Sequence, residues 1–418
     1  MKNSITSAAK EIAEKLSYAK IVMLGEASHG THEFYEWRRL ISQELITHHG
    51  FSFIAVEGDW PPCYAANRLI TSKRSYAEKE LIHHFHRWPS WMWANTEVVE
   101  LLNWMKSHNQ KLKAKKPVGF YGLDVYSLFE SIDEVLSTLK KLDPALAKAA
   151  KEQYACFQKF HRDEKRYAQS LYFSSGCETQ VLLVLQDLLK AKHLELSGET
   201  LFDAQQNARI VKNAEDYYRT MIHGDEDSWN VRDRHMMETL NILLSHHGDN
   251  AKAIVWAHNT HIGDYRATSM VDEGQVNLGG LARIEWGINK IALLGFGTYE
   301  GSVVASRAWD GPVQLMQVPK GKSGSYEDLF HQKCLNEKSD YIFSWLQGST
   351  DLELNQTRGH RAIGVVYDPR FESFGNYVPT KLASRYDGFL FIDQTRGLTP
   401  LSVSVDRREF PETFPGGF

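Results

Sequence analysis

Ile21-Val22-Met23-Leu24-Gly25-Glu26-Ala27-Ser28-His29-Gly30 is the stretch that decides the fold. It begins as an apolar run of strand length and then turns, between two glycines, through an acid and a histidine. Three further apolar runs end in the same way, at a residue that can transfer a proton. They are Phe53–Val56 before Glu57, Val118–Leu123 before Asp124, and Ala253–Ala257 before His258. Because ligands sit beyond the carboxyl ends of strands in open parallel sheets, these runs predict an enzyme site at one sheet edge.

The segment between the first two runs predicts a helix. Phe34, Trp37, Ile41 and Leu45 recur at steps of three and four residues, and Gly50 follows where the helix would end. A strand, a helix and a second strand form a crossover unit, which makes the two strands parallel.

Residues 126–250 show no convincing strand and repeat their apolar residues with helical spacing. Strands are predicted again at Ala253–Ala257, Ile291–Leu294, Tyr341–Phe343, Ala362–Val366 and Gly388–Ile392. We therefore predict an α/β fold with a mostly parallel central sheet flanked by helices and a mixed or antiparallel edge. Residues 126–250 would be a helical insertion that caps the carboxyl ends of the strands. The core, residues 1–125 and 251–418, would form one composite domain with this cap.

Composition narrows the class of protein. The chain of 418 residues is 42% hydrophobic and 24% charged, as in soluble globular proteins, and its net charge of −4 argues against nucleic acid as a partner. No run approaches the roughly 18 apolar residues of a membrane span, and the first twenty residues lack the apolar core of a signal peptide. The four scattered cysteines predict free thiols in a reducing compartment, so we expect a cytoplasmic protein without membrane contact.

The Pro- and Gly-rich residues 411–418 are expected to be loosely held.

His29 is the predicted general base. It would lie near a helix N-terminus, whose positive end disfavours an imidazolium, and Glu26 could hold its ring in one tautomer. His258 could stabilise an oxyanion or protonate a leaving group. Arg38 could clamp Glu26, Glu57 or a substrate oxygen, or make a purely structural ion pair. The simpler alternatives are a helix cap at Ser28 beside an incidental histidine, and loop histidines satisfied by the backbone.

Other catalytic motifs are missing from the sequence. It contains neither Gly-x-Ser-x-Gly nor His-Glu-x-x-His, and Gly321-Lys322-Ser323 lacks the earlier glycine of a phosphate-binding loop. His83-His84-Phe85-His86 has metal-binding side chains, although a polar helix face is the favoured interpretation. A base without an obvious side-chain nucleophile indicates hydrolysis by activated water.

Six ordered blocks over most of the chain resemble the erythromycin esterase family. They are Gly25–Gly30, Ala55–Trp60, Trp91–Glu97, Tyr121–Ser127, Trp229–Asp233 and Trp256–His261. The resemblance implies hydrolysis of a macrolide lactone or related ester, with His29 as the base and Glu26, Arg38, Glu57 and His258 as its catalytic companions. It also implies a cleft between sheet and cap, where the substrate would contact His261, Asp124, Tyr126, Trp93 and Asn259.

Three hypotheses follow for the function. The first is a metal-independent esterase that acts on a small-molecule ester without a cofactor. The second is a hydrolase that uses Glu26, His29, Glu57 and His258 as ligands for a divalent metal. The third is a non-catalytic family member that binds a small molecule. The tryptophans Trp88, Trp91 and Trp93 could line an apolar cleft or pack in the core, and the oligomeric state is left open.

Overall fold

The computed structural model describes residues 2–112, 116–191, 193–194, 198–223, 225–405 and 408–414. The first part of the chain alternates strands and helices and supplies three of the core strands. Its elements are α1 (Lys2–Leu16), β1 (Ile21–Leu24), α2 (His32–His49), β2 (Phe53–Asp59), α3 (Trp60–Thr71), α4 (Glu78–Ile82), α5 (Thr96–Lys111) and β3 (Gly119–Asp124). The predicted helix between the first two strands is therefore confirmed as α2, which ends at Gly50 with a positive φ of 73°.

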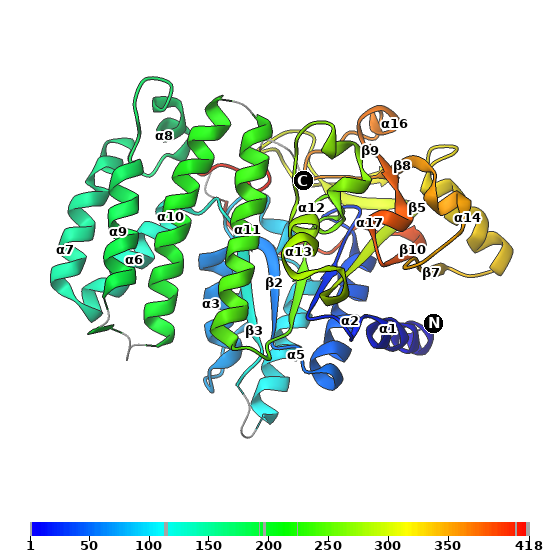
Figure 1. The fold of residues 1–418 in the computed structure, drawn as a ribbon, viewed down its shortest axis with the longest axis horizontal. Coiled ribbons are helices and arrows are strands. Elements are labelled where there is room, and N and C mark those ends of the chain that lie inside the picture. Colours follow the sequence, from blue (N-terminus) through cyan, green and yellow to red (C-terminus); the bar gives the residue numbers. More distant parts are fainter. Residues whose placement is uncertain are drawn as a thin grey trace.

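The segment between β3 and β4 consists of helices joined by loops, with no strand among its described residues. It contains α6 (Leu128–Leu142), α7 (Pro144–Gln153), α8 (Glu164–Ser170), α9 (Glu178–Lys190), α10 (Glu199–His223) and α11 (Asp225–His247). Figure 1 shows α6, α7, α9 and α10 as a layer of their own on the left, with α11 between this layer and the rest of the molecule. These helices bury a separate apolar cluster that includes Val135, Leu139 and Val211.

The last part of the chain completes the sheet. Its elements are β4 (Ala253–Trp256), α12 (Asn259–Ile262), α13 (Leu278–Trp286), β5 (Ile291–Ala305), β6 (Gln314–Val318), α14 (Tyr326–Glu337), β7 (Tyr341–Trp345), α15 (Leu352–Asn355), β8 (Thr357–Arg361), α16 (Glu372–Gly375), β9 (Tyr377–Lys381), α17 (Leu382–Arg385) and β10 (Gly388–Thr395). None of the helices in the described ranges is both long and apolar enough to cross a membrane.

The central sheet has the strand order β3-β2-β4-β1-β5-β10-β7, and β6 pairs with β5. All neighbours from β3 to β10 are parallel. Strand β7 pairs antiparallel with β10, and β6 pairs antiparallel with β5, which confirms the predicted mixed edge. Both faces are covered, because alternate residues of β1 enter two different cores. Val22 and Leu24 pack with the helices of the first part, and Ile21 and Met23 pack with α11, α13 and α14.

One predicted strand is wrong. Ala362–Val366 makes only isolated bridges, from Ile363 to Ser28 and from Val366 to Ser306. The run is apolar because it is buried against the loop after β1 and not because it joins the ladder. The strands β6, β8 and β9 were not predicted, since their side chains are largely polar or exposed.

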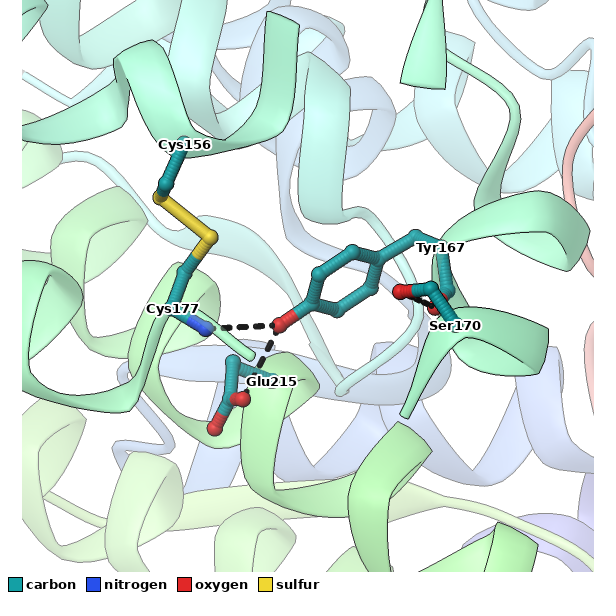
Figure 2. The surroundings of a disulfide bond; sticks show 5 residues. All are labelled: Cys156, Tyr167, Ser170, Cys177 and Glu215. Carbon is teal, nitrogen blue, oxygen red and sulfur yellow. Dashed lines mark hydrogen bonds between the residues drawn. A yellow bond between two sulfur atoms is a disulfide. The ribbon is translucent and has the colours of Figure 1, made fainter. Parts of the chain in front are cut away.

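The prediction of four free cysteines is wrong for two of them. Cys156 and Cys177 form a disulfide within the helical segment, while Cys63 and Cys334 are free and buried. Figure 2 shows the hydroxyl of Tyr167 next to this disulfide, where it accepts a hydrogen bond from the Cys177 backbone N–H (3.1 Å) and donates one to Glu215 (2.9 Å). The cysteine pattern therefore no longer supports a reducing compartment.

The prediction of a loose C-terminus is wrong for its described part. Pro411, Glu412 and Thr413 are buried. The carbonyl oxygen of Phe414 accepts hydrogen bonds from the hydroxyls of Tyr126, in the loop after β3, and Tyr217, in α10. Residues 415–418 lie outside the described residues. The segment before them is thus part of the packed interior between the sheet and the helices.

Candidate active site

The sheet topology gathers the predicted residues at one edge. Strand β4 lies between β1 and β2, and β3 follows β2, all of them parallel. Their carboxyl ends therefore meet, with Glu26 after β1, Glu57 near the end of β2, Asp124 at the end of β3 and His258 two residues after β4. The four strand ends do share one region, as the sequence predicted.

His29 lies in the turn between β1 and α2 with its ring fully buried. Its Nδ1 lies 3.0 Å from Oε1 of Glu26. Because a carboxylate can only accept, the proton of the neutral ring sits on Nδ1 and the lone pair on Nε2. No hydrogen-bond partner for that Nε2 is found among the described residues. His29 therefore has the tautomer of a general base.

Arg38 fixes the carboxylate that orients His29. Its Nη2 donates to Oε2 of Glu26 at 2.7 Å. The guanidinium is fully buried between the rings of Tyr35 and Trp256, at 4.4 and 4.6 Å from their centroids. Of the partners predicted for Arg38, the structure shows Glu26, so Arg38 acts on His29 through that side chain.

His258 has the opposite tautomer. It starts α12, and its Nδ1 accepts from the backbone N–H of Thr260 at 3.3 Å and lies 2.8 Å from the hydroxyl oxygen of the same residue. A backbone N–H can only donate, so the ring proton of neutral His258 is on Nε2. Burial, and then the neighbouring His29, lower the pKa of His258 well below its ordinary value and keep the ring neutral. The two ring centroids are 4.9 Å apart.

Glu57 connects this pair to a charged network. Its Oε2 accepts from the backbone N–H of His258, and its Oε1 accepts from Arg232 Nη2, both at 2.7 Å. Burial alone would raise the pKa of Glu57, but His261 and Arg232 lower it well below its ordinary value. Glu57 is therefore a carboxylate that holds the backbone of the second histidine in place.

Arg232 comes from α11 and was not predicted as a site residue. Its Nε and Nη2 donate to the two oxygens of Asp124 at 2.9 and 2.7 Å, and its guanidinium lies 5.3 Å from the ring centroid of Tyr126. The only sequence signal was its place in the block Trp229–Asp233. The long helical segment thus contributes a cation that joins the ends of β2 and β3.

His261 sits between two carboxylates. Its Nδ1 lies 2.9 Å from Asp233, another unpredicted residue of α11, and its Nε2 lies 3.3 Å from Glu57. Arg232 Nη1, 3.0 Å from the same Nε2, favours the neutral ring. Burial also lowers the pKa of His261, but the two carboxylates outweigh both effects and raise it to about 10. The two carboxylates therefore favour the protonated form of His261 at pH 7.

The predicted substrate-binding residues have different surroundings. Asp124 and His261 belong to the charged network, and Tyr126 lies against Arg232. The side chain of Asn259 instead bonds both the N–H and the C=O of Phe296, which fastens α12 to β5. Trp93 lies against Gly58, where a Cβ would come within 2.6 Å of its Nε1.

The tryptophans Trp88, Trp91 and Trp93 are all buried in the core on one face of the sheet, and each also lines a pocket, so both of the roles considered for them stay open. In the part of the chain that the structure describes, Glu26, His29, Glu57 and His258 do not form a group of ligand atoms close enough to share a metal ion; the one such group is elsewhere, at His86, Glu130 and Glu409. The nitrogens and oxygens of the four predicted ligands are largely directed at one another and at Arg38, Arg232 and Thr260.

Comparisons with known proteins give the same fold over nearly the whole chain. One similar structure is a protein from Bacillus cereus, with a TM-score of 0.76 and 21% identity over 91% of this chain and 90% of that one. Another is a mutant of the erythromycin esterase EreC in its open conformation, with a TM-score of 0.64 and 16% identity over 92% and 93% of the two chains. At these identities the likeness establishes the fold.

Sequence comparisons place the chain in a family. A putative hydrolase of Bacillus subtilis (strain 168), YbfO, is 21% identical over 394 residues, which cover 90% of this chain and 83% of that protein. The family model described as Erythromycin esterase matches residues 46–395, which is well over half of the chain. This chain therefore belongs to the erythromycin esterase family.

Proposed function

We propose that this protein hydrolyses a carboxylic ester or lactone with a water molecule that His29 activates. One observation carries the proposal: two buried histidines lie side by side with opposite tautomers. Glu26 leaves Nε2 of His29 as an acceptor, and Thr260 leaves Nε2 of His258 as a donor. An acceptor and a donor at one place are what attack by water on a carbonyl requires.

The reaction uses His29 twice, first as a base and then as an acid, and it uses His258 once. Nε2 of His29 takes a proton from water while the water oxygen forms a bond to the carbonyl carbon. The Nε2–H of neutral His258 stabilises the resulting oxyanion. When the carbon–oxygen bond to the alcohol breaks, the imidazolium of His29 returns the proton to the leaving alkoxide, so the products are an acid and an alcohol.

The surroundings support this division of roles. Glu26, held by Arg38, stabilises the imidazolium that forms on His29, as the acid of a catalytic triad does. The His29 and His258 rings are both 0% exposed, so a substrate reaches them only when the surrounding chain moves. Family membership agrees with an ester or lactone substrate, and a macrolide is one candidate within that class.

A mass-spectrometric screen for water addition across macrolides, aryl esters and acylated sugars tests the proposal. The wild type should convert at least one substrate, and His29→Ala should not. His32→Ala is the matched control. His32 lies three residues after His29 in the sequence, and its Nδ1 makes a similar contact with the carboxylate of Glu97 (2.7 Å). A folded His29→Ala protein with full turnover would remove His29 from the mechanism. Loss of wild-type turnover after chelation would favour the metal-dependent alternative.

A further inference from the structure

A second buried charged cluster is centred on Arg87, close to the end of β2. The guanidinium donates to three carboxylates from three segments of the chain. Its Nε lies 2.6 Å from Asp59, its Nη1 lies 2.8 Å from Glu164, and its Nη2 lies 2.8 Å from Glu130. Arg87 therefore joins β2, α6 and α8, and the proposed hydrolysis uses none of these contacts.

Carboxylates outnumber cations in this cluster. Glu409 and Glu412 of the C-terminal segment add two buried acids, and among the ion pairs found for the described residues Glu409 has one with a histidine, His86, at 3.6 Å. The arginines at the rim have other acids as partners: Arg68 lies 3.8 Å from Asp203, and Arg162 pairs with Asp133. Uncompensated buried negative charge is costly, so the site favours an added cation or added protons.

Several oxygens of these acids have no hydrogen-bond partner among the described residues. They are Oδ1 of Asp59 and Oε2 of Glu130, Glu409 and Glu412. The side chains of Asp59 and Glu412 are more than nine-tenths buried, and both line a pocket of about 240 Å³ together with His86 and Glu130. Buried carboxylate oxygens without a donor, beside a small pocket, are acceptors that a bound cation can use.

Three of these residues have the spacing of metal ligands. One ligand atom each from His86, Glu130 and Glu409 lies within 4.8 Å of the others. Atoms bound to one ion at about 2.0 to 2.4 Å lie no more than about 4 to 5 Å apart, so small side-chain shifts suffice. His86 is 38% exposed, which gives an ion a route into the pocket.

We propose that His86, Glu130 and Glu409 bind one divalent cation, with Asp59 and Glu412 supplying further negative charge. An imidazole with two carboxylates suits Mn²⁺ or Zn²⁺ better than Mg²⁺ or Ca²⁺. The ion would fasten the C-terminal segment to α6 and to the loop that carries His86. This site is separate from the histidine pair, and its occupancy does not depend on the proposed hydrolysis.

Titration of the chelator-treated full chain with Zn²⁺ or Mn²⁺ alone tests the site by calorimetry. One equivalent should bind and raise Tm by roughly 2 to 4 °C at saturation. Glu409→Gln and His86→Gln should each weaken binding by roughly 100-fold or more, since each removes a direct ligand. His83→Gln, which changes an exposed histidine of the same segment, should bind like the wild type.

Pulsed electron paramagnetic resonance of bound Mn²⁺ identifies the ligand. The wild type should show modulation from an imidazole nitrogen, and His86→Gln should lose it. Circular dichroism of the metal-free variants checks that they are folded. Three results would overturn the proposal: no metal binding to the wild type, equal metal affinity in all variants, or the same loss of affinity in His83→Gln as in His86→Gln. Shared protons would then be the way in which the excess carboxylates are neutralised.

Discussion

Two charged clusters sit only two residues apart along β2, and they balance charge differently. In the first cluster, three basic side chains face four carboxylates: Arg38, Arg232 and His261 face Glu26, Glu57, Asp124 and Asp233. Around Asp59, Arg87 alone faces three acids, with two more close by. The first arrangement holds two histidines in fixed tautomers without outside help. The second is incomplete without protons or a cation, so burial of acids alone does not indicate which kind of site they form.

The largest expected effect is on turnover. His29→Ala should lower kcat by about 10³- to 10⁴-fold, because general base catalysis is lost while the charge balance around Glu26 and Arg38 is kept. Steady-state kinetics on a substrate found in the screen measure it, and an unchanged Tm shows that the fold has survived. A loss below tenfold would mean that the paired tautomers have no catalytic role.

Removing a buried positive charge from the first cluster should lower the free energy of unfolding. Arg232→Met leaves Glu57 and Asp124 buried without their guanidinium and should cost about 3 to 5 kcal/mol in urea unfolding. The control is Arg370→Met, which removes a solvent-screened pair with Asp368 and should leave the unfolding free energy nearly unchanged. Equal losses in the two variants would contradict the distinction between the buried network and a surface pair.

The same chemical change should have opposite signs in the two clusters. Glu26→Gln removes the charged partner of Arg38 and should lower the unfolding free energy by about 1 to 3 kcal/mol. Glu412→Gln removes one of the excess carboxylates, and in metal-free buffer it should raise that free energy by about 1 kcal/mol. Urea denaturation at one pH measures both, and a loss in both variants would show that the second cluster is not overcharged.

The smallest effect concerns protonation within the first cluster. Long-range ¹H–¹⁵N spectra should show His258 neutral with its proton on Nε2 down to well below pH 6.5, and His261 protonated up to about pH 10. The unfolded state then takes up a proton at His258 first, so this group lowers stability as pH falls below about 6.5. His261 acts in the opposite direction, because its contribution is complete below about 6.5 and is lost as pH rises towards 10. Ordinary titration of either ring near pH 6.5 would contradict the assignment.

The sequence predicted the part of the site that depends on strand ends. Buried parallel strands are continuous apolar runs, so Glu26, Glu57, Asp124 and His258 could be placed at one edge before any coordinates. Arg232 and Asp233 could not be placed in this way, because they lie on a helix and reach the edge only through tertiary packing. The strand predicted at Ala362–Val366 is wrong for a related reason, since an apolar run indicates burial and not strand pairing.

The second cluster illustrates the same limit more sharply. His83-His84-Phe85-His86 was interpreted as a polar helix face, yet α4 ends at Ile82 and His86 faces Glu409. The acids that meet there are spread from Asp59 to Glu412, so local spacing carries no sign of their assembly. The Cys156–Cys177 pair, 21 residues apart without a motif, was missed for the same reason.

The ring of Trp229 lies flat on the imidazole of His261, with centroids 4.5 Å apart and planes within 8°. A protonated imidazole accepts electron density from an excited indole more readily than a neutral one does, so this stacking makes Trp229 an optical reporter. Its emission should brighten when His261 loses its charge in alkaline solution. The difference between the wild type and Trp229→Phe would isolate that signal from the other ten tryptophans among the eleven in the chain.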